Sequence, residues 1–92
     1  MDQEHFYVLS FESTSHAIQT EKLMKGKFAT VTIPTPREIT HSCGLSVKLL
    51  APDLNAVMVF LDALKVPYGF YRLSEGKTEG KRSVEPVRTN AV

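Results

Sequence analysis

The chain lacks tryptophan, has a single cysteine, and carries neither a strong net charge nor a long apolar run. One cysteine, Cys43, cannot form a disulfide within the chain, so no oxidised framework stabilises the fold. A net charge of +1 provides no general attraction for nucleic acid or for an anionic membrane. The longest apolar run, residues 56–61, is far shorter than the roughly 20 residues that span a bilayer. We therefore expect a soluble protein without a nucleic-acid or membrane partner.

The length of 92 residues, 42% of them hydrophobic, is enough for one domain with a modest core. The segment Met1–His5 is polar and acidic, which is the reverse of a signal peptide. Together with the absence of disulfides, this composition predicts a cytoplasmic protein.

Apolar and β-branched runs predict four strands, and helical spacing of apolar residues predicts two helices. The expected strands cover residues 6–11, 28–33, 45–49 and 69–73. The first helix is expected from Thr14 to about Lys25, with Gly26 ending it. The second begins at Pro52–Asp53 and continues to about Leu64, before a proline. The apolar face of the first helix is predicted to contain Ala17, Thr20, Leu23 and Met24; that of the second contains Leu54, Val57, Met58, Leu61 and Leu64.

This order predicts an α+β fold, a ferredoxin-like β-α-β-β-α-β sandwich. Its four-stranded antiparallel sheet would carry both helices on one face. The domain is expected over residues 1–73. Residues 74–92 contain few apolar side chains and are predicted to form a flexible polar C-terminal tail.

The segment Pro34–Gly44 is the most informative in the chain. It connects two predicted strands and ends with the only cysteine followed by a glycine. A loop of this length in so small a domain is rarely only a connector. Two prolines stiffen its start, and Arg37, Thr40, His41 and Ser42 provide hydrogen-bond donors. The connection rules place the first two strands parallel, with one strand between them. The loop and the start of the first helix, at Ser13 and Thr14, are therefore expected at the same end of the sheet.

Four motifs resemble a small bacterial family, the putative selenium/sulfur carrier protein-like family. They are Phe11-Glu12-Ser13-Thr14, Glu21-Lys22-Leu23, Ile33-Pro34-Thr35-Pro36-Arg37-Glu38-Ile39 and Ser42-Cys43-Gly44-Leu45. The resemblance implies a thiol-based carrier that holds sulfur or selenium on Cys43 as a persulfide or selenosulfide. A cysteine desulfurase-type donor and an acceptor enzyme would then be its partners, and no cofactor or metal is expected. His41 and the polar C-terminal segment depart from the family pattern.

Carrier chemistry requires the thiolate form of Cys43, whereas a free cysteine with a pKa of about 8.5 is mostly protonated at neutral pH. Backbone N–H groups at the start of the first helix, together with Arg37 or His41, would favour the anion. Ser42, Gly44 and Arg37 would shape the loop. The alternative is a buried structural cysteine, which packs as a small hydrophobe.

Other residues of this region also have two interpretations. Arg37 could pair locally with Glu38 or bind an anion through its planar guanidinium group. Ser13 and Thr14 could cap the helix or leave N–H groups free to bind an anion. Glu21 is more often a solvated residue than a catalytic acid.

No metal-ligand spacing joins the three histidines to Cys43, although a zinc shared across a dimer would need fewer ligands from each chain. Two rivals to the carrier remain. One is a non-catalytic module that binds a small anion or a protein, with an incidental cysteine. The other is a regulatory domain that forms a homodimer through exposed edge strands.

Overall fold

The computed structural model describes residues 5–37, 39, 44–50, 52–74 and 83–90. The elements in chain order are β1 (His5–Ser10), α1 (Thr14–Met24), β2 (Thr30–Pro34), β3 (Leu45–Leu49), α2 (Leu54–Ala63), β4 (Tyr68–Ser74) and β5 (Val84–Asn90). The predicted α+β class is confirmed. Both helices and all four expected strands are present, and their ends lie within two residues of the predicted positions.

The sheet has five strands in the order β2-β3-β1-β4-β5, and every neighbouring pair is antiparallel. The expectation of four strands is wrong, because residues 84–90 of the segment predicted to be a flexible tail add β5 beside β4. As predicted, β3 lies between β1 and β2, and β1 lies between β3 and β4. Each helical connection therefore crosses over one intervening strand.

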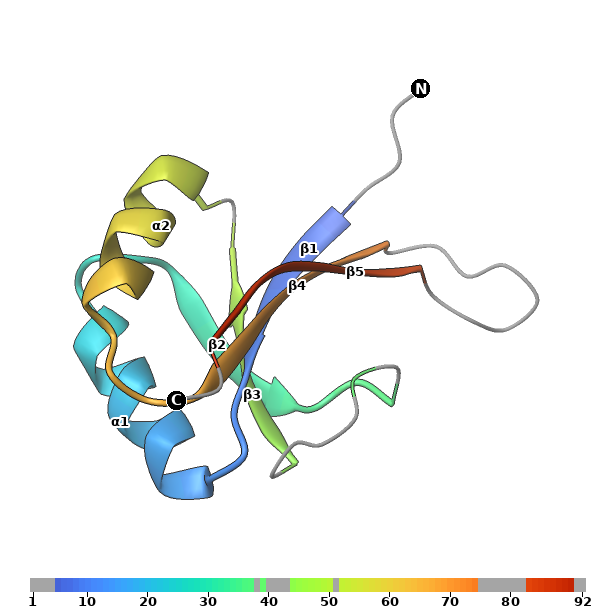
Figure 1. The fold of residues 1–92 in the computed structure, drawn as a ribbon, viewed down its shortest axis with the longest axis horizontal. Helices are drawn as coiled ribbons and strands as arrows, with labels where there is room; N and C mark the ends of the chain where they lie inside the picture. Colours follow the sequence, from blue (N-terminus) through green and yellow to red (C-terminus); the bar gives the residue numbers. More distant parts are fainter. Residues whose placement is uncertain (1–4, 38, 40–43, 51, 75–82, 91–92) are drawn as a thin grey trace.

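Both helices lie on the same side of the sheet (Figure 1). Between them and the strands is the main core, in which β1, β3 and β4 contribute Leu9, Val47, Leu49 and Phe70 and the helices contribute Ala17, Met24, Val57 and Leu61. All eight side chains are at most 2% exposed. Alternate residues of a strand point to opposite faces, so this set is the inward half of each strand.

The two helices fit their predicted apolar faces to different degrees. In α1, Ala17, Thr20 and Met24 are buried, but Leu23 is 53% exposed, so its predicted place in the core is wrong. α2 buries Val57 and Leu61, but Leu54 of its predicted apolar face is 37% exposed. Its N-cap is Asp53, whose side chain accepts hydrogen bonds from the N–H groups of two residues in the first turn. Such a cap contributes about 1 kcal/mol to helix stability.

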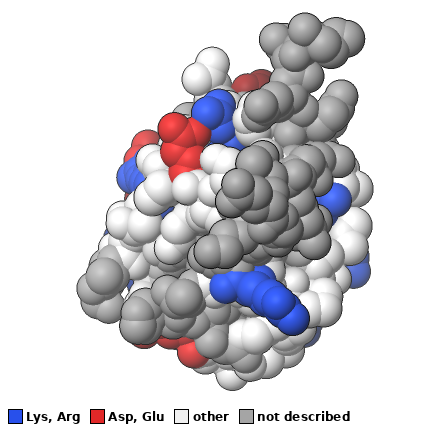
Figure 2. All heavy atoms as spheres, turned by 90° about the vertical axis from the view of Figure 1, so that its right-hand side faces the viewer, with Lys and Arg blue, Asp and Glu red and all other residues white. Residues whose placement is uncertain are grey.

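The opposite face of the sheet, called the helix-free face from here on, carries a smaller apolar cluster. Its buried members are Val8, Leu73 and Ile39, and Ile39 belongs to the loop between β2 and β3. Phe6, Ile33, Tyr71 and Val84 are partly buried around them. Figure 2 views the molecule from this side; charges of both signs are spread over it, with no continuous field of one sign among the described residues.

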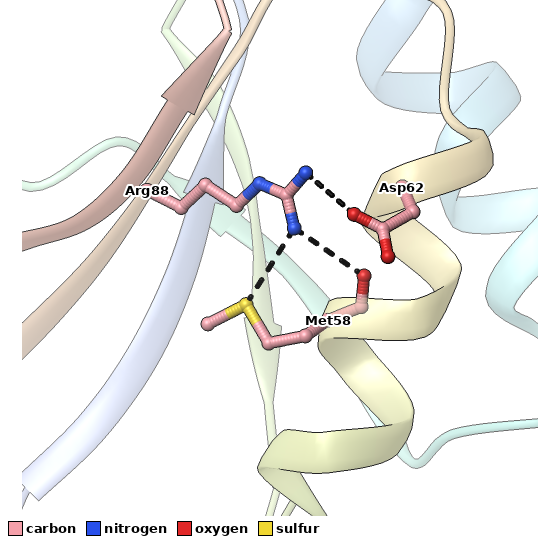
Figure 3. Close-up of polar contacts among 3 residues, drawn as sticks. All are labelled: Met58, Asp62 and Arg88. Carbon is pink, nitrogen blue, oxygen red and sulfur yellow. Dashed lines mark hydrogen bonds and ion pairs between the residues drawn. The ribbon is translucent and has the colours of Figure 1, made fainter.

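Two ion pairs attach β5 to the rest of the fold. Arg72 of β4 pairs with Glu85 across the strand pair. Arg88 reaches α2, where one guanidinium nitrogen lies 2.6 Å from Asp62 and the other contacts the carbonyl oxygen and the sulfur of Met58 (Figure 3). β5 buries little apolar surface, so these polar contacts and the backbone pairing hold it in place.

Candidate functional site

The loop between β2 and β3 has a firmly bonded base. Pro34 pairs with Leu45 at the end of the β2–β3 ladder, and beyond this pair the N–H of Thr35 donates to the carbonyl oxygen of Gly44 at 2.9 Å. The loop is therefore the connection of an antiparallel hairpin, and its two ends are fixed to each other by backbone bonds.

Gly44 is exposed and has a φ of +98°. A residue with a side chain rarely adopts this region, so the site favours glycine for conformational reasons, although a Cβ there would meet no atom within 4 Å. A glycine directly after Cys43 thus has a conformational reason, and the shaping of the loop by Gly44 stays a prediction.

Three hydroxyl groups lie in a row across the helix-free face, beside the base of the loop. The Oγ atom of Ser46 is 2.7 Å from Oγ1 of Thr35, and Ser46 has no exposed surface. Ser10 lies directly opposite Ser46 in the ladder and is 6% exposed, and its hydroxyl contacts the carbonyl oxygen of Gly69 at 3.5 Å. This end of the sheet is therefore polar beneath the loop, whereas the centre of the same face is apolar.

Within the loop, Ile39 and Arg37 have opposite roles. Ile39 is 6% exposed and packs into the cluster of the helix-free face, and its N–H donates to the carbonyl oxygen of Pro36 at 3.0 Å. Arg37 sits in that turn with its side chain exposed. No role was expected for Ile39, although one apolar side chain in an otherwise polar loop indicates an anchor.

The start of α1 and the loop lie at the same end of the sheet, the lower edge in Figure 1. The ladder explains this arrangement, since Ser10, the last residue of β1, pairs with Ser46 near the start of β3. However, α1 covers the helix face, whereas the loop is anchored on the helix-free face by Ile39.

Ser13 occupies the N-cap of α1, where its carbonyl oxygen accepts from the N–H of Ala17, but its side chain makes no capping hydrogen bond. Ser13 is therefore the helix cap by position, as one of its two interpretations expected, but it provides no side-chain hydrogen bond. Thr14 is the first helical residue and is exposed.

The remaining predicted site residues, Ser42 and Cys43, lie outside the described residues, as do Glu38, Thr40 and His41. The thiolate state of Cys43 and the Arg37–Glu38 ion pair therefore stay predictions. What the structure brings together is the frame around them, formed by Thr35, Ser46, Ile39 and Gly44.

A shallow cavity of about 420 Å³ opens at the other end of the sheet. Its lining comprises His5, Phe6, Tyr7, Lys48, Leu49, Leu50 and Pro52. The Nζ atom of Lys48 lies 4.8 Å above the centre of the Phe6 ring, so this cation already has a partner. The cavity is separated from the loop by most of the length of β3, because Lys48 lies near the end of that strand and Gly44 directly precedes its first residue.

The described ionisable groups with shifted pKa values are Tyr68, Arg72 and Arg88. Burial raises the pKa of Tyr68; Arg88 opposes this shift, and Asp62 adds to it. Hydrogen bonds to Glu85 and Asp62 raise the pKa values of Arg72 and Arg88, respectively. Among the described residues, no three His, Cys, Asp or Glu side chains are grouped to hold a metal, and no described helix is long and apolar enough to cross a membrane.

The fold and the loop define a small α+β domain with a glycine-closed hairpin loop fixed at one end of its sheet. The chain belongs to the family described as putative Se/S carrier protein-like, which matches residues 6–72. The matched region contains the whole loop and both helices but ends before β5. No curated protein and no solved structure matches the chain.

Proposed function

We propose that this protein is a thiol-based carrier of sulfur or selenium, and that Cys43 is the residue to which the carried sulfur or selenium atom is bound. The family match over residues 6–72, which includes the only cysteine of the chain, is the observation that carries this proposal. The bonded base of the loop supports it, because a carrier must present one sulfur atom in a reproducible position to two different partners.

The transfer conserves atoms and electrons. The Cys43 thiolate attacks the outer sulfur of a persulfide on the donor, a cysteine desulfurase-type enzyme. A new S–S bond forms at Cys43 while the S–S bond of the donor breaks, and the donor cysteine leaves as a thiolate. The acceptor enzyme then takes the outer sulfur from Cys43 by the same exchange. Selenium would follow the same course through a selenosulfide.

The described residues support this chemistry through the backbone of the loop. Gly44 turns the chain directly after Cys43, and the Thr35–Ser46 hydroxyl pair and the buried Ile39 limit movement of the loop base. We assign Arg37 to binding the donor or acceptor, since its exposed guanidinium group suits carboxylate or other oxyanion groups. Ser42 is assigned to shaping the loop.

The N–H groups of the first turn of α1, at Ser13 and Thr14, are assigned to favouring the thiolate. The Ser13 side chain accepts no hydrogen bond from this turn, so it does not compete with a thiolate for the N–H groups. The carrier proposal does not depend on these assignments, because the loop is anchored on the helix-free face, whereas α1 covers the helix face.

We further propose that β1 to β4 with α1 and α2 form a ferredoxin-like sandwich to which β5 is added. The crossing of each β-α-β unit over one strand supports this topology. A carrier thiol must stay reduced between transfers, so we place the protein in the cytoplasm.

The test is the intact mass of the protein after incubation with a cysteine desulfurase and cysteine. We expect a gain of one sulfur atom that a reductant removes. Cys43→Ser should gain none, whereas Ser15→Ala, outside the assigned residues, should load like the unmodified chain. A desulfurase with an established acceptor provides the positive control.

Absence of added sulfur, with the positive control loaded, would contradict the carrier proposal. Retention of partner binding by Cys43→Ser would then favour the non-catalytic binding module. Loading that stops at the persulfide with every acceptor enzyme tested would show that the chain stores sulfur without transferring it.

A further inference from the structure

The two outer strands of the sheet, β2 and β5, differ in how well their edges are protected. An edge strand presents backbone N–H and C=O groups that can pair with another chain. Natural proteins usually protect such an edge with charged residues, proline or a bulge. The presence or absence of these devices therefore indicates which edge can accept a partner.

The β5 edge has all three devices. Pro86 interrupts the strand, Glu85 and Arg88 carry opposite charges, and the register with β4 shifts between Phe70 and Tyr71. Continuous pairing of another strand along β5 is therefore disfavoured.

The β2 edge has no charge and no irregularity in register over Thr30–Ile33. Val31 is 44% exposed although it is apolar, and Thr32 is exposed. Pro34, at the very end of β2, is the only protecting residue of this strand.

The hydrogen-bond pattern shows which groups of β2 point outward. Thr35 donates to Gly44, and Leu50 donates to Ala29, so the odd-numbered positions of this segment bond to β3. In an antiparallel ladder these pairs alternate with pairs that do not bond to each other. The N–H groups of Thr30 and Thr32 therefore point away from β3, and none of the described residues lies beyond β2 to receive them.

We propose that a second copy of this chain pairs with β2 in antiparallel fashion about Thr32. In this register each Thr32 donates to the carbonyl oxygen of the other Thr32. Each Thr30 donates to the carbonyl oxygen of Pro34 in the other copy, and Pro34, which has no N–H, returns no bond. The arrangement is two-fold symmetric and joins the two sheets into one continuous sheet.

The side chains favour the same register. Val31 of one copy lies opposite Ile33 of the other on the helix-free face, which creates an apolar cross-strand pair on each side of the central Thr32 pair. No charged residue of β2 faces its own copy, so the pairing brings no like charges together. A second copy is thus a better occupant than a charged peptide strand, because β2 carries no charge that could pair with the charges of such a peptide.

The dimer should be weak. A ladder five residues long falls short of the roughly 1,200–2,000 Å² buried in stable interfaces. We expect a reversible monomer–dimer equilibrium that shifts with protein concentration through the micromolar range.

The experiment measures the mass of the protein by sedimentation velocity over a range of concentrations. It uses the full chain with Cys43→Ser, so that no intermolecular disulfide contributes. Thr32→Pro removes an outward N–H without removing an intrachain hydrogen bond of the ladder. Val31→Lys and Val87→Lys form a matched pair, since they place one charge at an exposed valine in each of the two edge strands, 44% and 38% exposed.

We expect the parent protein to dimerise as concentration rises, Thr32→Pro and Val31→Lys to remain monomeric, and Val87→Lys to dimerise like the parent. Amide exchange at Thr30 and Thr32 should slow as concentration rises. If Thr32→Pro fails to fold, as judged by circular dichroism, Val31→Lys carries the test.

A parent protein that is monomeric throughout, or a dimer that Val87→Lys disrupts and Val31→Lys does not, would overturn the proposal. Sulfur loading does not enter this assay. Failure of the dimer therefore leaves the proposed carrier function standing, and failure of sulfur loading leaves the dimer standing.

Discussion

The two faces of the sheet are covered by different means, although the same strands build both. On the helix face, side chains from α1 and α2 meet those of three strands in one continuous core. On the helix-free face, the buried cluster has three members, and one of them, Ile39, comes from a loop. Regular elements thus protect one face, and a connecting segment protects the other.

This difference assigns the stability of the domain to one face of the sheet and the positioning of the loop to the other. The helix face contains most of the buried apolar area and should determine whether the chain folds. Among the described residues of the loop, a single apolar side chain and a hydroxyl pair join it to the helix-free face. Changes there should loosen the loop more than they destabilise the domain.

The largest expected effect is in the main core. Leu61→Ala removes a side chain that is 1% exposed, and it should lower the free energy of unfolding by about 3–4 kcal/mol. Chemical denaturation monitored by circular dichroism measures this change. Val59→Ala, two residues earlier on the opposite side of α2 and 68% exposed, is the control and should change stability by less than about 0.5 kcal/mol. Equal losses in the two variants would show that α2 packs differently.

Ile39→Ala should have a smaller effect on global stability, about 2 kcal/mol, because the loop can partly collapse into the space left behind. The same variant should change the rate at which Cys43 reacts with iodoacetamide, since the loop loses its anchor. Leu61→Ala provides the comparison: measured well below its unfolding transition, it should leave that rate unaltered. If Ile39→Ala destabilised the chain as strongly as Leu61→Ala and left alkylation unaffected, the distinction between the faces would fail.

Ser46→Ala removes one partner of the 2.7 Å hydroxyl contact to Thr35 and should reduce stability by about 1 kcal/mol. A double-mutant cycle with Thr35→Val isolates the pair, and a favourable coupling energy of that order is expected. Additive effects of the two substitutions would mean that the hydroxyl pair does not stiffen the loop base.

The smallest effect concerns pH. Burial raises the pKa of Tyr68 above its usual 10.0, so the folded state disfavours the phenolate relative to the unfolded state. The resulting stability is fully present below about pH 10 and is lost as pH rises through the folded pKa. Urea unfolding at pH values from about 8 to 11 should show a steeper alkaline loss for the parent than for Tyr68→Phe. Parallel curves would contradict this expectation.

The sequence predicted the elements whose apolar residues repeat at a regular spacing. Val57 and Leu61 of α2 are buried as that spacing requires, and β3 has the predicted bounds. The pattern was less reliable at the margins of each face, because Leu23 of α1 and Leu54 of α2 belong to the apolar sets by spacing but are 53% and 37% exposed. Periodicity shows which residues share a helix face, but it does not show how much of that face a neighbouring element covers.

Strand β5 was missed because its evidence is not local. Its sequence contains Pro86 and four polar residues, and it is a strand only because β4 offers an edge and Asp62 of α2 receives Arg88. The candidate site was predictable in the same limited way. Gly44 could be assigned from composition, whereas the burial of Ile39 and the contact between Thr35 and Ser46 depend on residues distant in the chain.

The position of β5 has a practical consequence for anyone shortening this protein. The family match ends at residue 72, which makes a chain cut after Ser74 an obvious choice for expression. Without β5, the outer edge of β4, a long and mostly buried strand, would be uncovered, and the backbone donors and acceptors of that edge would face water. We expect the truncated protein to precipitate or to form larger aggregates, and a solubilising fusion placed at its C-terminus would hide the defect rather than repair it.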